Sequence, residues 1–226
     1  DLAIGSGVER VLEAHQAVTP NLRGVRHITA FDGSPDVPRP RPFPEGLFGD
    51  AKFREGFAVL EKLGLSFDAY IYHPQLHELA DLANAFPGVT IILNHVGGPL
   101  GVGPYAGKRD QIFEEWKGSM TAVAASPNVV VKVGGLVMPV CGFDWHERAM
   151  PTTSGSLAQA TARYYLHCIE QFGPNRCMFE SNFPVDKIAC SYTVLWNAFK
   201  RLAHDFSPSE QAALFHDTAT RVYRLS

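Results

Sequence analysis

Polar and titratable residues follow short apolar segments at five separate places in the chain. They are Arg26 with His27, His73, Asn94 with His95, Lys132, and Glu180 with Asn182 and Asp186 in the stretch RCMFESNFPVDK. Imidazole and carboxylate groups are the usual general acids and bases of enzymes, and Arg or Lys cations can stabilise an oxyanion. These residue types could therefore transfer protons and bind an oxygen-rich substrate.

Each of these residues also has a structural interpretation. His27 and His73 could cap neighbouring helices, and His95 could be a core histidine, although it shortly precedes Gly97-Gly98-Pro99. Lys132 lies inside an apolar segment, where an unpaired ammonium group is costly, so it must pair with a carboxylate or a substrate anion. A structural ion pair and a catalytic role remain open for Lys132.

The segment from Gly134 to Ala149 combines stacking surface, charge and a titratable imidazole in one loop. It contains Phe143, Asp144, Trp145, His146 and Arg148. We expect Trp145, His146 and Arg148 to contact a substrate, and packing on the rim of the fold is the alternative. Motifs for other chemistries are missing, since the sequence has no Gly-x-Ser-x-Gly, and neither the HExxH nor the Walker spacing is met.

Hydrophobic periodicity predicts an alternation of strands and helices along the chain. The predicted strands are 24–29, 66–72, 90–96, 129–134 and 177–181, and the predicted helices are 8–18, 53–63, 76–85, 111–125, 157–172, 192–203 and 208–223. Such alternation favours parallel strands with right-handed crossovers, and the apolar strands indicate that helices cover the sheet. We expect a single α/β domain over residues 1–226.

The predicted connections are unequal in length. Helix-to-strand links are short, whereas three strand-to-helix links are long: 30–52, 97–110 and 135–156. Long loops at the carboxyl ends of parallel strands are the usual position of the site in α/β folds and barrels. Because side chains alternate along a strand, we also expect Glu180 and Asn182 to share a face.

Composition and charge argue against binding to nucleic acid or to a membrane. The chain of 226 residues has a net charge of -3, and it has no long basic or apolar run. We therefore expect a small-molecule substrate, no nucleic-acid partner and no membrane partner. The four cysteines form no CxxC pair, which favours a reducing, cytoplasmic location.

Three stretches together resemble the amidohydrolase family 2 group, whose members include lactonases. They are Ile92-Leu-Asn-His-Val-Gly-Gly-Pro99, Val130-Val-Lys-Val-Gly-Gly135 and the stretch from Arg176 to Pro184. The resemblance covers the chain from about Gly24 to Leu225 and implies a (β/α)8 TIM barrel. About five parallel strands are visible in the sequence, so we expect the first two or three strand-helix units to be missing; an open doubly wound sheet is the alternative.

The resemblance also implies a divalent metal, most often zinc, with His73 and His95 as candidate ligands. Two departures leave a metal-independent site open as the alternative, or reflect a chain that is a fragment of the family's barrel. The family's His-x-His pair is absent from this sequence, and Asn182 stands where the family usually has an aspartate. An amide cannot accept a proton from water as that carboxylate does.

The resemblance implies a hydrolase that opens a lactone, or a related C–O or C–N bond, of a small carboxylated or sugar-derived substrate. The expected catalytic residues are His95, Glu180, Asn182, Asp186 and Lys132, and the expected substrate-binding residues are Arg26, His27, His73, Trp145, His146 and Arg148. A metal-dependent decarboxylase is one alternative. An inactive, incomplete barrel is another, and open sheet edges would then allow pairing with another copy of the chain in a homo-oligomer.

Overall fold

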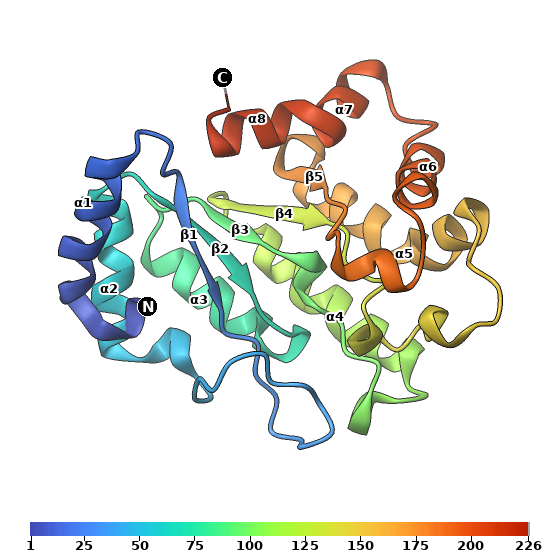
Figure 1. The fold of residues 1–226 in the computed structure, drawn as a ribbon, viewed down its shortest axis with the longest axis horizontal. Helices are drawn as coiled ribbons and strands as arrows, with labels where there is room; N and C mark the ends of the chain where they lie inside the picture. Colours follow the sequence, from blue (N-terminus) through green and yellow to red (C-terminus); the bar gives the residue numbers. More distant parts are fainter. Residues whose placement is uncertain (226) are drawn as a thin grey trace.

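A five-stranded parallel sheet forms the centre of the molecule (Figure 1). The computed structural model describes residues 1–225. The strands are β1 (Gly24–Ile28), β2 (Ser66–Tyr70), β3 (Ile91–Leu93), β4 (Val129–Val133) and β5 (Cys177–Phe179), in the spatial order β1-β2-β3-β4-β5. All neighbouring strands are parallel, which confirms the predicted sheet.

Helices connect and cover the strands. They are α1 (Val8–Val18), α2 (Ala51–Lys62), α3 (Leu76–Ala85), α4 (Arg109–Ala124), α5 (Ser154–Phe172), α6 (Tyr192–Leu202), α7 (Pro208–Ala212) and α8 (Thr218–Tyr223). A π-helical turn over Ala213–Asp217 joins α7 to α8, so the last predicted helix is interrupted at this turn. Side-chain caps fix several helix starts, for example Asp50, which accepts from the backbone N–H of Phe53, and Ser207, which forms a capping box with Glu210.

One face of the sheet is apolar and packs against the helices. Phe67, Ile91, Val131 and Cys177 point to this face and are fully buried. Side chains of α2 to α6 complete this core, including Phe57. The apolar strands predicted from the sequence therefore pack against a helical layer, as expected for parallel sheets.

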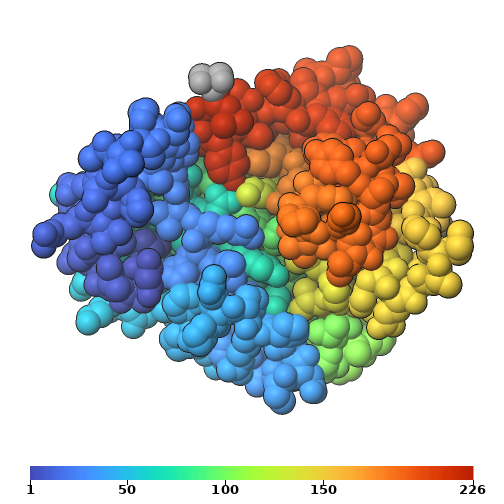
Figure 2. All heavy atoms as spheres, in the orientation of Figure 1, coloured from blue at the N-terminus to red at the C-terminus, as the bar shows by residue number. Residues whose placement is uncertain are grey.

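The opposite face carries the polar side chains. Strand register places Arg26 beside Asp68 on neighbouring strands, and Lys132 beside Met178. A small apolar patch remains on this face, and Val222 of α8 packs on it. In Figure 2 this face is hollowed in its middle, between the N-terminal segments in blue and the C-terminal segments in orange and red.

No helix among the described residues combines the length and apolar character required to cross a bilayer.

Candidate active site

His95 and Glu180 form the central pair of the polar face. His95 follows β3, Glu180 follows β5, and β4 lies between the two strands. The Nδ1 atom of His95 lies 2.5 Å from Oε1 of Glu180, and the backbone N–H of His95 donates to the same oxygen at 3.0 Å. Both side chains are largely buried, so the sheet holds an imidazole and a carboxylate in fixed contact.

Two glycines at the end of β4 allow this pair to meet. A Cβ on Gly135 would lie 2.6 Å from Nδ1 of His95, and a Cβ on Gly134 would lie 2.4 Å from the backbone oxygen of Glu180. Gly135 also has a φ of +75°, which a side chain disfavours. The Val-Gly-Gly motif therefore provides the space in which His95 reaches Glu180.

Arg26 determines which nitrogen of His95 is the acceptor. Its guanidinium nitrogen Nη2 lies 3.3 Å from Nε2 of His95. A guanidinium can only donate, so Nε2 accepts and the proton of the neutral ring is on Nδ1, where Glu180 accepts it. The ring of Tyr70 packs edge-on against His95 with 4.9 Å between ring centres, which fixes the plane of the imidazole.

The charge state of Glu180 follows from its neighbours. Burial alone would raise the pKa of Glu180, but the adjacent His95 and the Lys132 ammonium outweigh burial and lower that pKa below its usual value. Glu180 is therefore an anion at neutral pH. An anionic carboxylate on Nδ1 orients the imidazole and stabilises its protonated form.

Asn182 and Asp186 form a second pair, beyond the end of β5. The amide of Asn182 donates to Oδ1 of Asp186 at 2.7 Å. Asp186 is fully buried, and burial and the charge of Glu180 raise its pKa to about 8. The prediction that Glu180 and Asn182 share a strand face is wrong, because β5 ends at Phe179 and Asn182 has a φ of +51°.

Lys132 pairs with Asp68, a residue that the sequence reasoning missed. The Lys132 ammonium lies 2.7 Å from Oδ1 of Asp68, which also accepts from the amide of Asn94 and the hydroxyl of Tyr223. Among the alternatives for Lys132, the structure therefore shows the ion pair with a protein carboxylate. A carboxylate in the otherwise apolar strand Ser66–Tyr70 was the signal that could have identified Asp68.

His27 and His73 lie away from the central pair. His27 points to the helical face, where Phe43 packs on it at 4.5 Å between ring centres, and burial lowers its pKa to about 4. This position does not support the predicted substrate contact of His27, because alternation along β1 directs it opposite to Arg26. His73 is buried against Tyr105, its Nδ1 accepts from the backbone N–H of Leu100, and burial lowers its pKa to about 4.

The predicted metal ligands His73 and His95 are thus engaged separately. Nδ1 of His73 accepts a backbone N–H, and the two ring nitrogens of His95 face Glu180 and Arg26. Within residues 1–225, no three His, Cys, Asp or Glu side chains are grouped closely enough to hold a metal ion.

The aromatic loop forms a cavity of its own. Trp145 is buried and stacks on Phe143, with 4.5 Å between ring centres. Trp145, His146 and Arg148 line a cavity of about 530 Å³ together with residues 187–191, and none of Arg26, His95 and Glu180 lines it. The structure therefore brings these three predicted residues together but not with the central pair.

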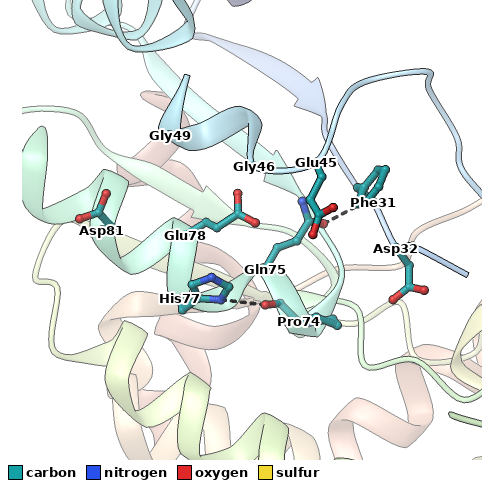
Figure 3. Close-up of a pocket in the computed structure, with 11 residues that line it drawn as sticks. Phe31, Asp32, Glu45, Gly46, Gly49, Pro74, Gln75, His77, Glu78 and Asp81 are labelled. Atoms are coloured by element: carbon teal, nitrogen blue, oxygen red, sulfur yellow. Dashed lines mark hydrogen bonds between the residues drawn. The ribbon is translucent and has the colours of Figure 1, made fainter. Parts of the chain in front are cut away.

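A larger cavity lies between α3 and the loop that follows β1. It has a volume of about 620 Å³ and is lined by Asp32, Glu45, Glu78 and Asp81, with His77 beside them (Figure 3). No Arg or Lys lines this cavity, so it lacks the cation that an anionic substrate or an oxyanion requires. The central pair remains the better candidate for chemistry.

Comparison with known proteins gives one family and several relatives. The family model described as amidohydrolase matches residues 6–225. An uncharacterised protein of Sinorhizobium fredii, y4mH, is 40% identical over 91% of this chain. An L-fucono-1,5-lactonase of Burkholderia multivorans is 29% identical over the whole chain.

Solved structures agree with the sequence comparison. An amidohydrolase from Burkholderia multivorans, solved with bound HEPES and with bound zinc, is 28% identical and superposes with a TM-score of 0.80. This chain covers 72% of that protein, 69% of the lactonase and 62% of the Sinorhizobium protein. The five-stranded sheet therefore corresponds to part of each relative.

Proposed function

This chain belongs to the amidohydrolase family, and we propose that it opens the ester bond of a small lactone with an activated water molecule. Its fold is of the (β/α)8 barrel type that its structural neighbours have. Two relatives named as L-fucono-1,5-lactonases, 29% and 28% identical, support a sugar-derived lactone as the substrate class. The single observation that carries the proposal is the His95–Glu180 pair with Arg26 at Nε2.

In the proposed mechanism, His95 is the general base. Nε2 takes a proton from water while the water oxygen attacks the lactone carbonyl carbon, and Glu180 stabilises the imidazolium that forms. Arg26 is exposed on this face, so its guanidinium can turn from Nε2 to the carbonyl oxygen and stabilise the oxyanion. The C–O bond of the ring then breaks, and the imidazolium returns its proton to the leaving oxygen.

The other polar residues support this pair. Lys132 lowers the pKa of Glu180 through its charge while it remains paired with Asp68. Asp186, with a pKa of about 8, carries its proton at neutral pH and is unsuited to serve as the base there. We therefore assign the role of the missing aspartate to the His95–Glu180 pair and not to Asn182 or Asp186.

A metal ion in a hydrolase activates water and polarises carbonyl groups. One related structure contains zinc. The described residues of this chain do not fit a metal by themselves, because His73 and His95 have separate partners and no third ligand is grouped with them. The proposed hydrolysis therefore uses the side chains of this chain alone.

Substitution of the central pair tests the proposal. We expect His95→Ala and Glu180→Gln each to lower kcat/KM for L-fucono-1,5-lactone by about 10²–10⁴, the usual contribution of general acid–base catalysis. His77→Ala is the matched control, since His77 is exposed and bonds only to the carbonyl of Pro74. Full activity in His95→Ala, measured as acid release from a panel of lactones, would contradict the assignment.

A further inference from the structure

The cavity beneath the aromatic loop has features that the proposed hydrolysis does not use. It lies between the loop that contains Trp145 and the segment from Lys187 to Val194. Its volume of about 530 Å³ is within the usual range for small-molecule sites. Trp145, His146 and Arg148, which the sequence predicts as substrate-binding residues, line this cavity and lie apart from the central pair.

The charged groups at this cavity are all cationic. Arg148 and Lys187 line it with His146, and no Asp or Glu is part of the lining. Among residues 1–225, the side chains of Arg148 and Lys187 have no hydrogen-bond or salt-bridge partner, while the guanidinium of Arg148 lies 6.0 Å from the centre of the Trp145 ring. The carboxylate of Glu147, next in the chain to His146, is largely exposed and lies 3.9 Å from that imidazole.

The remaining lining is mostly apolar. Trp145, Ala189 and Cys190 are buried within it, and Ile188 at its edge is 54% exposed. A cavity lined by apolar side chains and by two exposed, unpaired cations is complementary to a molecule with a hydrophobic body and one acidic group.

We propose that this cavity binds an organic anion, a carboxylate carried on an apolar body, at a site separate from the His95–Glu180 pair. The carboxylate lies between Arg148 and Lys187, and the apolar body rests against Trp145 and Ile188. This inference does not depend on the proposed lactone hydrolysis.

Isothermal titration of the chain with three probes tests the charge and the apolar body separately. Phenylacetate has both features, phenylacetamide lacks the charge, and acetate lacks the apolar body. We expect phenylacetate to bind with a saturable isotherm and the other two to bind at least about tenfold more weakly, the equivalent of about 1.4 kcal/mol. Equal binding of all three probes, or no saturable binding of phenylacetate, would overturn the proposal.

Variants locate the binding site. We expect Arg148→Gln with Lys187→Gln to weaken phenylacetate binding at least about tenfold, since both charge-assisted contacts are lost. Lys117→Ala is the matched control, because Lys117 is an exposed cation on α4 outside the cavity. The glutamines keep most of the side-chain volume, so we expect the double variant to fold like the parent. Equal thermal unfolding temperatures of the two proteins confirm this. Unchanged affinity in the double variant, or loss of binding in His95→Ala, places the anion elsewhere and refutes this assignment.

Discussion

Two carboxyl groups that follow β5 lie in different electrostatic environments, one beside cationic or hydrogen-bonding groups and one, among the described residues, without a cation. Glu180 faces His95 and Lys132, so its pKa is lowered despite burial. Asp186 is fully buried, has only the amide of Asn182 as a side-chain partner, and has a pKa raised to about 8 by burial and by Glu180. Two nearby acids can therefore have different charges at neutral pH, and only the ionised one contacts the imidazole.

The buried Asp186 makes stability depend on pH. An aspartate in the unfolded chain has a pKa of about 3.9. Because the folded-state pKa is higher, about 8, the folded state holds the proton more tightly, and this stabilisation is lost as the pH rises through that value. Between about pH 5 and pH 9, we expect the unfolding free energy of the parent to fall relative to that of Asp186→Asn by at least about 1.4 kcal/mol, one pKa unit.

Urea unfolding of both proteins at the two pH values measures this difference. The asparagine keeps an oxygen that can accept from Asn182. Asp36→Asn is the control, because Asp36 is exposed, and it should show no comparable change. Parallel pH dependences for the parent and Asp186→Asn would refute the buried protonated carboxyl.

At the scale of elements, the sequence predicted the strands and helices better than the loop geometry. The periodicity of hydrophobic residues and the turn-forming residues located all five strands, because strand formation depends on local hydrophobic patterns. Positive φ values at His95 and Asn182 changed where those side chains point, and no periodicity reports them. The sequence predicted that the site includes the polar residues Arg26, His95 and Glu180. It could not predict the contacts among them, because these depend on the order of the strands and on the glycines after β4.

The loop after β4 provides the sharpest test at this scale. Gly135→Ala would place a methyl group 2.6 Å from Nδ1 of His95 at a φ of +75°. We expect the His95–Glu180 contact to be displaced, with kcat/KM reduced at least about tenfold and stability lowered by about 1–3 kcal/mol for the strained backbone.

Gly118 of α4 offers the matched control for this substitution. A Cβ at Gly118 would meet no atom within 4 Å. Gly118→Ala should therefore leave lactone hydrolysis unchanged and stabilise the helix by about 0.5–1 kcal/mol. If Gly135→Ala retained the parent's activity, the glycine would not be needed for the approach of His95.

At the scale of the whole molecule, the C-terminal segment contacts the polar face of the sheet and the residue that precedes β1. Tyr223 donates to Asp68, and the backbone oxygen of Arg23 accepts from the Arg224 guanidinium at 2.9 Å. Val222 covers apolar side chains of three strands. The two hydrogen bonds link residues more than 150 positions apart, so sequence patterns within short windows could not predict them.

Substituting Tyr223 by Phe removes the hydroxyl that bonds to Asp68 and keeps the aromatic ring, so it tests the contribution of this hydrogen bond to stability. The single hydroxyl hydrogen is shared between the two carboxylate oxygens of Asp68, which lie 2.9 and 3.1 Å from the Tyr223 oxygen, and a hydrogen bond to a charged group contributes about 1.5–3 kcal/mol. We expect Tyr223→Phe to lower the unfolding free energy by about 1.5–3 kcal/mol in urea titrations. Tyr192→Phe, at a half-exposed position on α6, should change it by less than about 0.5 kcal/mol. Equal effects of the two substitutions would show that Asp68 is held by Lys132 and Asn94 alone, and that α8 contributes only apolar cover.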